Sequence, residues 1–167
     1  MSDWRTDIEA NLRAFCEEYD LSRNLFSTEY LPAPHMPPSW PRGKMGVYAF
    51  WTGRLEEWLK IGKAGPNSQP RWTTHHYLIG CADSCLPESL RSDPEMSEVS
   101  ELDRYELRAW IMRNTCRANI LVSARVDQGI LLRLEAFLHA RLKPRYEGGR
   151  RGAPSYDLTC LARLSWL

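Results

Sequence analysis

Residues 45–62 read MGVYAFWTGRLEEWLKIG, and this stretch decides the fold that the sequence predicts. Its first part, Met45 to Thr52, is rich in β-branched and aromatic residues, and Thr52-Gly53-Arg54 supplies a turn. Glu57 to Gly62 is a second run of the same kind. Two such runs on either side of a glycine turn predict antiparallel strands joined as a hairpin. We therefore expect a β-hairpin at the start of the folded domain.

Further elements are expected on both sides of the hairpin. Apolar side chains at helical intervals predict an amphipathic helix from Trp4 to Tyr19, and five prolines in residues 31–41 predict a connector. After the hairpin the patterns predict a helix over 68–78, a polar turn-rich segment over 80–100, a helix over 103–113, a strand over 118–124 and a helix capped by Asp127 that ends at 142–143. The expected fold is α+β: a small three-stranded antiparallel sheet flanked by helices, with an N-terminal amphipathic helix.

The composition fits one globular domain. The chain has 167 residues, 43% of them hydrophobic and 26% charged, and it can bury a core without a disulfide scaffold or a structural metal. Its longest apolar run, Val47 to Trp51, is far shorter than the roughly 20 residues that cross a bilayer, so we expect no membrane partner. Five scattered cysteines and an acidic N-terminus without the features of a signal peptide favour a reducing cytoplasm.

The net charge of +1 conceals an uneven distribution along the chain. Residues 1–40 carry three basic and seven acidic side chains, whereas residues 125–167 carry eight basic and four acidic ones. The near-neutral total argues against the broadly basic surface that many nucleic-acid binders have. It remains compatible with a local phosphate site in the basic last quarter. We expect residues 1–42 to form the N-terminal helix and connector, residues 43–148 the domain with its insertion at 80–100, and residues 149–167 a basic and aromatic tail.

Four short elements occur in a fixed order along the chain. They are Gly46-Val47-Tyr48, then Lys60-Ile61-Gly62 after eleven intervening positions, then Arg71 nine positions beyond Gly62, and finally Glu135 within LEAFLHARLKPRYEG. Together they resemble the GIY-YIG nuclease superfamily over about residues 43–148, with lysine in place of the second motif tyrosine. Some restriction enzymes of that kind also carry lysine there. The resemblance implies a metal-dependent endonuclease that hydrolyses phosphodiester bonds in DNA, with a role in restriction or phage defence.

Tyr48 and Lys60 are the first two candidate catalytic residues. The resemblance assigns the tyrosine to the metal site, where it activates the attacking water. A phenol has an ordinary pKa of about 10 and needs help to act as a base near pH 7. Lys60 would stabilise the phenolate, or would itself accept the proton when desolvated. The alternatives are a core tyrosine and an exposed strand lysine, and Lys63 is a weaker candidate because its side chain should point to the opposite face of the strand.

Arg71 and His75, four residues apart, are expected to share one face of the helix over 68–78. A guanidinium there can hold a phosphate in bidentate fashion, and an imidazole can bond a phosphate oxygen or exchange a proton. Some restriction enzymes of the family resemble this pair, with histidine at the same offset. The alternative is a solvated arginine beside a partly buried histidine. His76 points about 100° away from His75 and is interpreted as surface or packing.

Glu135 lies among Leu131, Leu134 and Leu138 in an otherwise apolar helical segment. A carboxylate there is costly unless a cation, a hydrogen-bond network or a metal compensates it. The resemblance assigns it to a single divalent cation, and carboxylate oxygen suits Mg²⁺ or Mn²⁺. The alternative is a glutamate paired with Arg133 or His139. Glu147, which follows the Lys-Pro turn, is either a second carboxylate or a loop residue and is left outside the predicted site.

A second functional interpretation belongs to a different class. A catalytically quiet nucleic-acid-binding or complex-assembly subunit would keep the same fold, with a partner protein docked on the N-terminal helix or a second copy forming a homodimer. A zinc site of His76, Cys81 and Cys85 is a weak pattern, because Cys-x3-Cys has no second pair at the usual spacing. DNA is the expected partner in the first interpretation, and Mg²⁺ or Mn²⁺ the expected cofactor.

Overall fold

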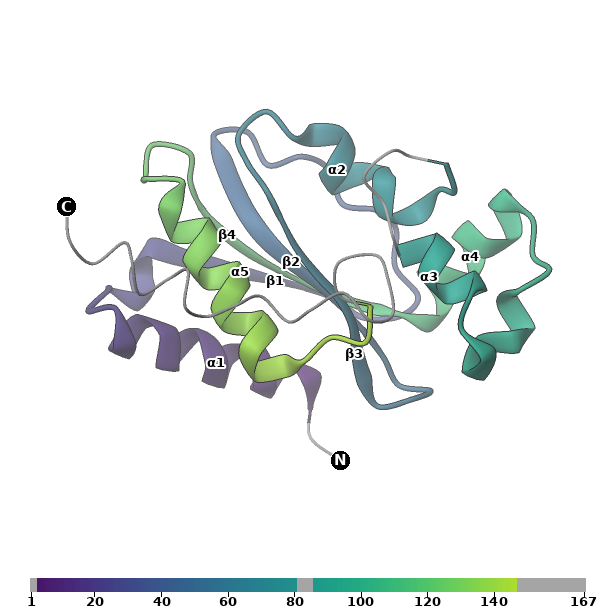
Figure 1. Cartoon of the computed structure of the whole chain (residues 1–167). Helices are drawn as coiled ribbons and strands as arrows, with labels where there is room; N and C mark the ends of the chain where they lie inside the picture. Colours follow the sequence, from purple (N-terminus) through teal and green to yellow (C-terminus); the bar gives the residue numbers. More distant parts are fainter. Residues whose placement is uncertain (1–2, 81–85, 147–167) are drawn as a thin grey trace.

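A four-stranded antiparallel sheet forms the centre of the molecule. The computed structural model describes residues 3–80 and 86–146. The sheet has the order β1-β4-β2-β3, and helices cover both of its faces (Figure 1). The strands are β1 (Phe26–Leu31), β2 (Lys44–Thr52), β3 (Glu57–Ala64) and β4 (Cys116–Ser123). The α+β class, the antiparallel sheet and the N-terminal helix are confirmed, but the prediction of three strands was wrong.

The additional strand is β1, which pairs with β4 from Phe26 opposite Val122 to Leu31 opposite Arg117. In its sequence, FSTEYL, Phe26, Thr28 and Tyr30 are more buried than Ser27 and Glu29 between them, and a period of two is typical of a strand. The signal is weak because the run is short and lies between a helix and the prolines of residues 31–41. Part of the predicted N-terminal segment therefore belongs to the sheet itself.

Helices and short 3₁₀ turns connect the strands. Their bounds are α1 (Trp4–Glu18), η1 (Arg23–Leu25), α2 (Gln69–Thr73), η2 (His75–Tyr77), α3 (Leu86–Arg91), η3 (Pro94–Val99), α4 (Arg104–Asn114) and α5 (Gly129–Leu142). The predicted helix over 68–78 is interrupted at Thr74, whose backbone (φ −129°, ψ −49°) is not helical. The predicted turn-rich insertion contains α3 and η3, and the predicted tail over 149–167 lies outside the described residues.

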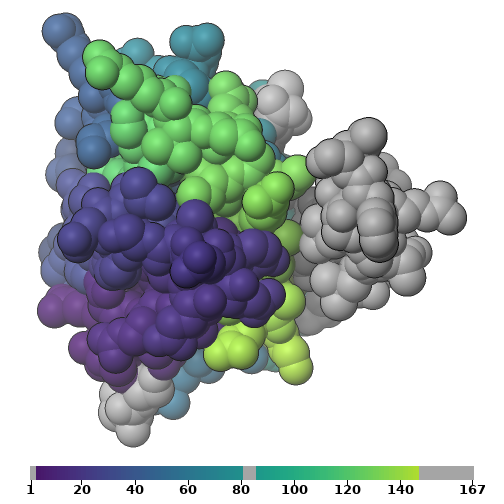
Figure 2. All heavy atoms as spheres, turned by 90° about the vertical axis from the view of Figure 1, so that its left-hand side faces the viewer, coloured from purple at the N-terminus to yellow at the C-terminus, as the bar shows by residue number. Residues whose placement is uncertain are grey.

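Helices α1 and α5 cover one face of the sheet. They lie next to each other, with a hydrogen bond of 3.1 Å from Arg141 Nε to Asn11 Oδ1, and Figure 2 shows the purple N-terminal residues beside the green residues that include α5. The apolar stripe of α1 is buried in this core together with the inward side chains of α5; the set is Trp4, Ile8, Leu12, Phe15, Ile130, Leu131, Leu134 and Leu138. The stripe is therefore used within this chain, and a partner of α1 would meet its polar side.

The segments from α2 to α4 cover the opposite face. Their core includes Tyr48 and Phe50 of β2, Trp72 of α2 and Tyr77 of η2, and it continues into the apolar sides of α3 and α4. After α5 the chain is fastened beside η3, because Arg145 donates bonds of 2.6 and 3.1 Å to the buried Asp93 carboxylate. No helix in the described part of the chain is long and apolar enough to span a membrane.

Candidate active site

Tyr48 occupies the middle of β2, opposite Gly62 of β3 on one side and Asn119 of β4 on the other. Its side chain is fully buried. The phenol ring lies across Gly62, so that a Cβ at that position would stand 2.6 Å from Cζ of the tyrosine. The absence of a side chain at Gly62 is therefore what lets the ring extend over β3. This brings the hydroxyl group to the outermost strand of the sheet.

Arg71 of α2 meets that hydroxyl. Its Nε donates a hydrogen bond of 3.4 Å to the phenol oxygen of Tyr48. Burial raises the pKa of Tyr48, while the positive charges of Arg71 and Arg117 oppose that rise. The Glu135 carboxylate acts in the same direction as burial, which places it within electrostatic reach of the phenol. Of the predicted site residues, Tyr48 and Arg71 are thus in contact, and Glu135 acts on the phenol of Tyr48 through its charge.

Glu135 lies on α5 and forms an ion pair with Lys63 of β3. The carboxylate is mostly buried, with 16% of its side chain exposed, whereas Lys63 is 37% exposed. Lys63 is therefore a cation that compensates Glu135. Lys63 does point to the opposite face from Lys60, as expected, but that face is the one that α5 covers. The pair stands at the open side of the site, on an edge strand.

Lys60 occupies a different place. It pairs with Phe50 across β2 and β3, on the same face of the sheet as Tyr48, and only 8% of it is exposed. The structure therefore does not give it the exposed position that was the alternative for this lysine. Its charge acts on His76, whose pKa it helps to lower, whereas the cations that lower the pKa of Tyr48 are Arg71 and Arg117.

In the structure His76, and not His75, lies next to Tyr48. Because the chain leaves helical geometry at Thr74, His75 starts a 3₁₀ turn and does not continue the face of Arg71. His76 is the residue that packs on Tyr48, with ring centroids 4.4 Å apart. It is fully buried, and burial together with the charge of Arg117 lowers its pKa well below the ordinary value. The imidazole next to Tyr48 is therefore neutral.

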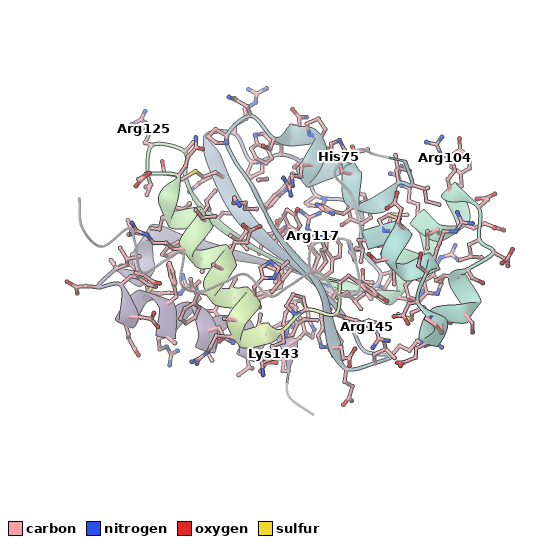
Figure 3. All side chains as sticks on the ribbon, viewed as in Figure 1. His75, Arg104, Arg117, Arg125, Lys143 and Arg145 are labelled. Atoms are coloured by element: carbon pink, nitrogen blue, oxygen red, sulfur yellow. The ribbon has the colours of Figure 1, made fainter. Side chains whose placement is uncertain are left out.

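Arg117 of β4 is a component that the sequence did not reveal. It is fully buried, and its guanidinium lies 4.7 Å from the ring centroid of Trp72 and 5.2 Å from that of Tyr48. Figure 3 labels it at the centre of the molecule, with His75 on the segment above it. A single arginine in the strand sequence CRANILVS carries no pattern that would distinguish it from a solvent-facing residue.

Glu135 is the residue to which the sequence analysis assigned a divalent cation. Within residues 3–80 and 86–146 no group of three or more histidine, cysteine or acidic side chains could enclose a metal ion. Mg²⁺ is often held by one or two carboxylates and completes its shell with waters and substrate phosphates. Glu135 is the carboxylate that such an ion would use, and its Oε2 is the oxygen that Lys63 contacts. Glu147, Cys81 and Cys85 lie outside the described residues.

Comparison of the chain with protein-family models, with curated proteins and with solved structures finds no match.

Proposed function

We propose that this protein is a divalent-metal-dependent endonuclease that hydrolyses phosphodiester bonds in DNA. One observation carries the proposal: the Tyr48–Arg71 hydrogen bond and the Lys63–Glu135 ion pair involve four different elements, and the charge of Glu135 acts on the phenol of Tyr48. They combine a phenol that can exchange a proton, two cations for phosphate oxygens and a carboxylate that can hold a metal. Phosphoryl transfer depends mainly on positioning and electrostatic stabilisation of this kind.

The residues divide the chemical work between them. The phenolate form of Tyr48 takes the proton of the attacking water while the new P–O bond forms, the bond to the leaving oxygen breaks, and that oxygen takes its proton from solvent. Arg71 opposes the rise in the pKa of Tyr48 that burial causes, and it stabilises the charge on the phosphoryl oxygens. Lys63 is paired with Glu135 and is exposed enough to meet a backbone phosphate. A divalent cation on Glu135 would supply positive charge at the scissile phosphate and its leaving oxygen.

A plasmid-nicking assay tests the proposal. Supercoiled DNA is incubated with Mg²⁺ or Mn²⁺ and with the wild type, Tyr48→Phe, Arg71→Gln or Glu135→Gln. Loss of one stabilising group of this kind typically costs roughly 10²- to 10³-fold in rate. We expect each variant to nick at least about 10²-fold more slowly than the wild type. Equal nicking by all four proteins would remove the assignment, because contaminating nuclease would then explain the activity.

A matched control separates the site from general effects of charge. Glu101→Gln makes the same chemical exchange as Glu135→Gln at an exposed position. We expect it to nick like the wild type and to bind a labelled duplex equally well in a gel shift. End-labelled products of the same reactions show whether cutting follows a sequence preference. Lys60 and His75 keep their place among the candidates, and variants of both belong in the same series.

The quiet-subunit alternative makes the opposite prediction in this series. It would be supported by duplex binding without cleavage under Mg²⁺ and Mn²⁺. The geometry favours the nuclease, because a binding subunit has no need for an arginine bonded to a buried phenol beside a half-buried carboxylate. The apolar stripe of α1 is also buried within the chain, which leaves that helix without an apolar docking face.

A further inference from the structure

Arg117 is a fully buried cation beneath the proposed active site. Within residues 3–80 and 86–146 no carboxylate lies within ion-pair distance of it. A buried charge is costly unless hydrogen bonds and partners compensate it. Here aromatic faces surround the guanidinium, with centroids 4.7 Å away for Trp72 and 5.2 Å away for both Tyr48 and Phe50. Such cation–π contacts gain strength when the cation is desolvated.

The hydrogen bonds of Arg117 lead to specific places in the fold. Nε donates to Asn119 Oδ1 at 2.8 Å, and Asn119 in turn donates to the Glu29 carboxylate of β1 at 2.7 Å. Nη1 donates to the main-chain oxygen of Trp72 at 2.9 Å and to the hydroxyl of Tyr77 at 3.2 Å. The arginine therefore connects the far edge of the sheet with the segment that carries α2 and η2.

The bond to Trp72 concerns the residue next to Arg71. Helix α2 has only five residues, and its N-cap, Ser68, makes no side-chain capping bond. A helix this short is not stable by itself in water. Arg117 supplies a charged donor to a carbonyl near its C-terminal end, where carbonyl groups otherwise lack partners. The same guanidinium lies over the ring of Tyr48, so one side chain contacts both Tyr48 and the residue next to Arg71.

We propose that Arg117 is a positioning residue, which holds α2 and the ring of Tyr48 so that the Arg71 guanidinium meets the Tyr48 hydroxyl. The consequence for catalysis rests on the proposed nuclease function, but the consequence for the local structure does not. The charge of Arg117 also opposes the rise that burial causes in the pKa of the phenol. Its role depends on the geometry of a fork with several donors, which lysine cannot reproduce.

Hydrogen exchange of the folded protein tests the structural half. The amides of Trp72, Thr74 and Tyr77 are hydrogen-bonded within the segment, and α1 provides remote reference amides. In Arg117→Met and Arg117→Lys we expect the three segment amides to exchange roughly 10- to 100-fold faster, with α1 unchanged. Arg113→Met, the same exchange at an exposed position of α4, should leave both regions as in the wild type. If Arg117→Met does not fold, Arg117→Lys decides alone.

The outcomes separate this proposal from the nuclease proposal. Unchanged exchange in the segment, or an equal rise in α1, would overturn the positioning role. If the wild type nicks DNA, the variants should lose about 10²-fold in kcat with KM nearly unchanged, and full activity would overturn the catalytic consequence. If the wild type does not nick and exchange still rises only in the segment, the nuclease proposal fails and the positioning role is supported.

Discussion

Gly62→Ala is the most direct test of how Tyr48 reaches the edge strand. A Cβ at Gly62 would stand 2.6 Å from Cζ of Tyr48 and closer still to its oxygen. Carbon atoms in contact normally lie about 3.5–4.0 Å apart. The ring must therefore move by about 1 Å. It has little room to do so. The centroid of the Tyr48 ring lies 4.4 Å from that of the His76 ring and 5.2 Å from Cζ of Arg117.

The displacement has two measurable effects. Inserting one methyl group into a well-packed core typically costs about 1–3 kcal/mol, so the free energy of unfolding in urea should fall by that amount. The hydroxyl would also move away from Arg71, and a shift of about 1 Å in a catalytic group can reduce the rate by about 10²-fold. We expect plasmid nicking to fall by this factor, while duplex affinity in a gel shift stays within about twofold of the wild type.

Gly65→Ala is the matched control for this prediction. Its nearest neighbours, Gln128 Oε1 and Ser68 Oγ, would lie 3.9 Å from the new Cβ, an ordinary contact distance. The same substitution should change stability there by less than about 0.5 kcal/mol and leave nicking unchanged. The reasoning is refuted if Gly62→Ala unfolds and nicks like Gly65→Ala, because the ring of Tyr48 would then not need the space above Gly62.

Three more predictions concern charged groups. Lys63→Met removes the cation beside Glu135 and should slow nicking by roughly 10²-fold, whereas Lys60→Met should cost less than about tenfold; the reverse order would make Lys60 the acting lysine. Arg71→Gln should raise the pKa of Tyr48, because a neighbouring positive charge that opposes the rise from burial is lost. The titration can be followed by ¹³C NMR of the Tyr48 Cζ, with its signal assigned from Tyr48→Phe. An unchanged titration in Arg71→Gln would contradict this prediction. Burial alone would raise the pKa of Asp93, but bonds from Arg145 and Tyr146 lower it from 3.8 to about 2. The ionised carboxylate therefore stabilises the fold at pH values above its ordinary pKa. This stabilisation is lost as the pH falls through about 2. Asp93→Asn should therefore cost about 2 kcal/mol at pH 7, and the urea midpoints of the two proteins should converge between about pH 5 and pH 2; a constant difference would show that the ionised form of Asp93 adds nothing.

The parts of the fold that could be predicted are those with a local, periodic signal. The hairpin of β2 and β3, helix α1 and helix α5 each have an apolar pattern of the correct period, and the structure places them within a few residues of the predicted bounds. Strand β1 has the same kind of pattern over only six residues, and its partner β4 lies some 90 positions later in the chain, as the Asn119–Glu29 bond illustrates. Pairing at that separation depends on the assembled core and leaves no local mark.

The predicted site residues show the same difference between local and long-range information. Tyr48, Arg71 and Glu135 were named from a resemblance to a family motif; in the structure Arg71 bonds Tyr48, and the charge of Glu135 acts on the same phenol. His76 lies beside Tyr48, where His75 was the predicted site residue, because the backbone leaves helical geometry at the single residue Thr74. No helical pattern in QPRWTTHHYL indicates where that break falls. Residues next to a helix end are therefore the least predictable members of a site.

The two lysines of β3 show that knowing which face of the sheet a side chain is on does not tell which residues lie next to it. Alternation along a strand correctly separates Lys60 from Lys63, but it does not say which face α5 covers, and that choice puts Glu135 beside Lys63. Groups on opposite faces of a sheet can meet only beyond an outermost strand, and β3 is such a strand. Tyr48 reaches that edge from one face because Gly62 has no side chain, and Glu135 reaches it from the other along α5. The glycine and the edge position together are what allow one site to draw on both layers of the fold.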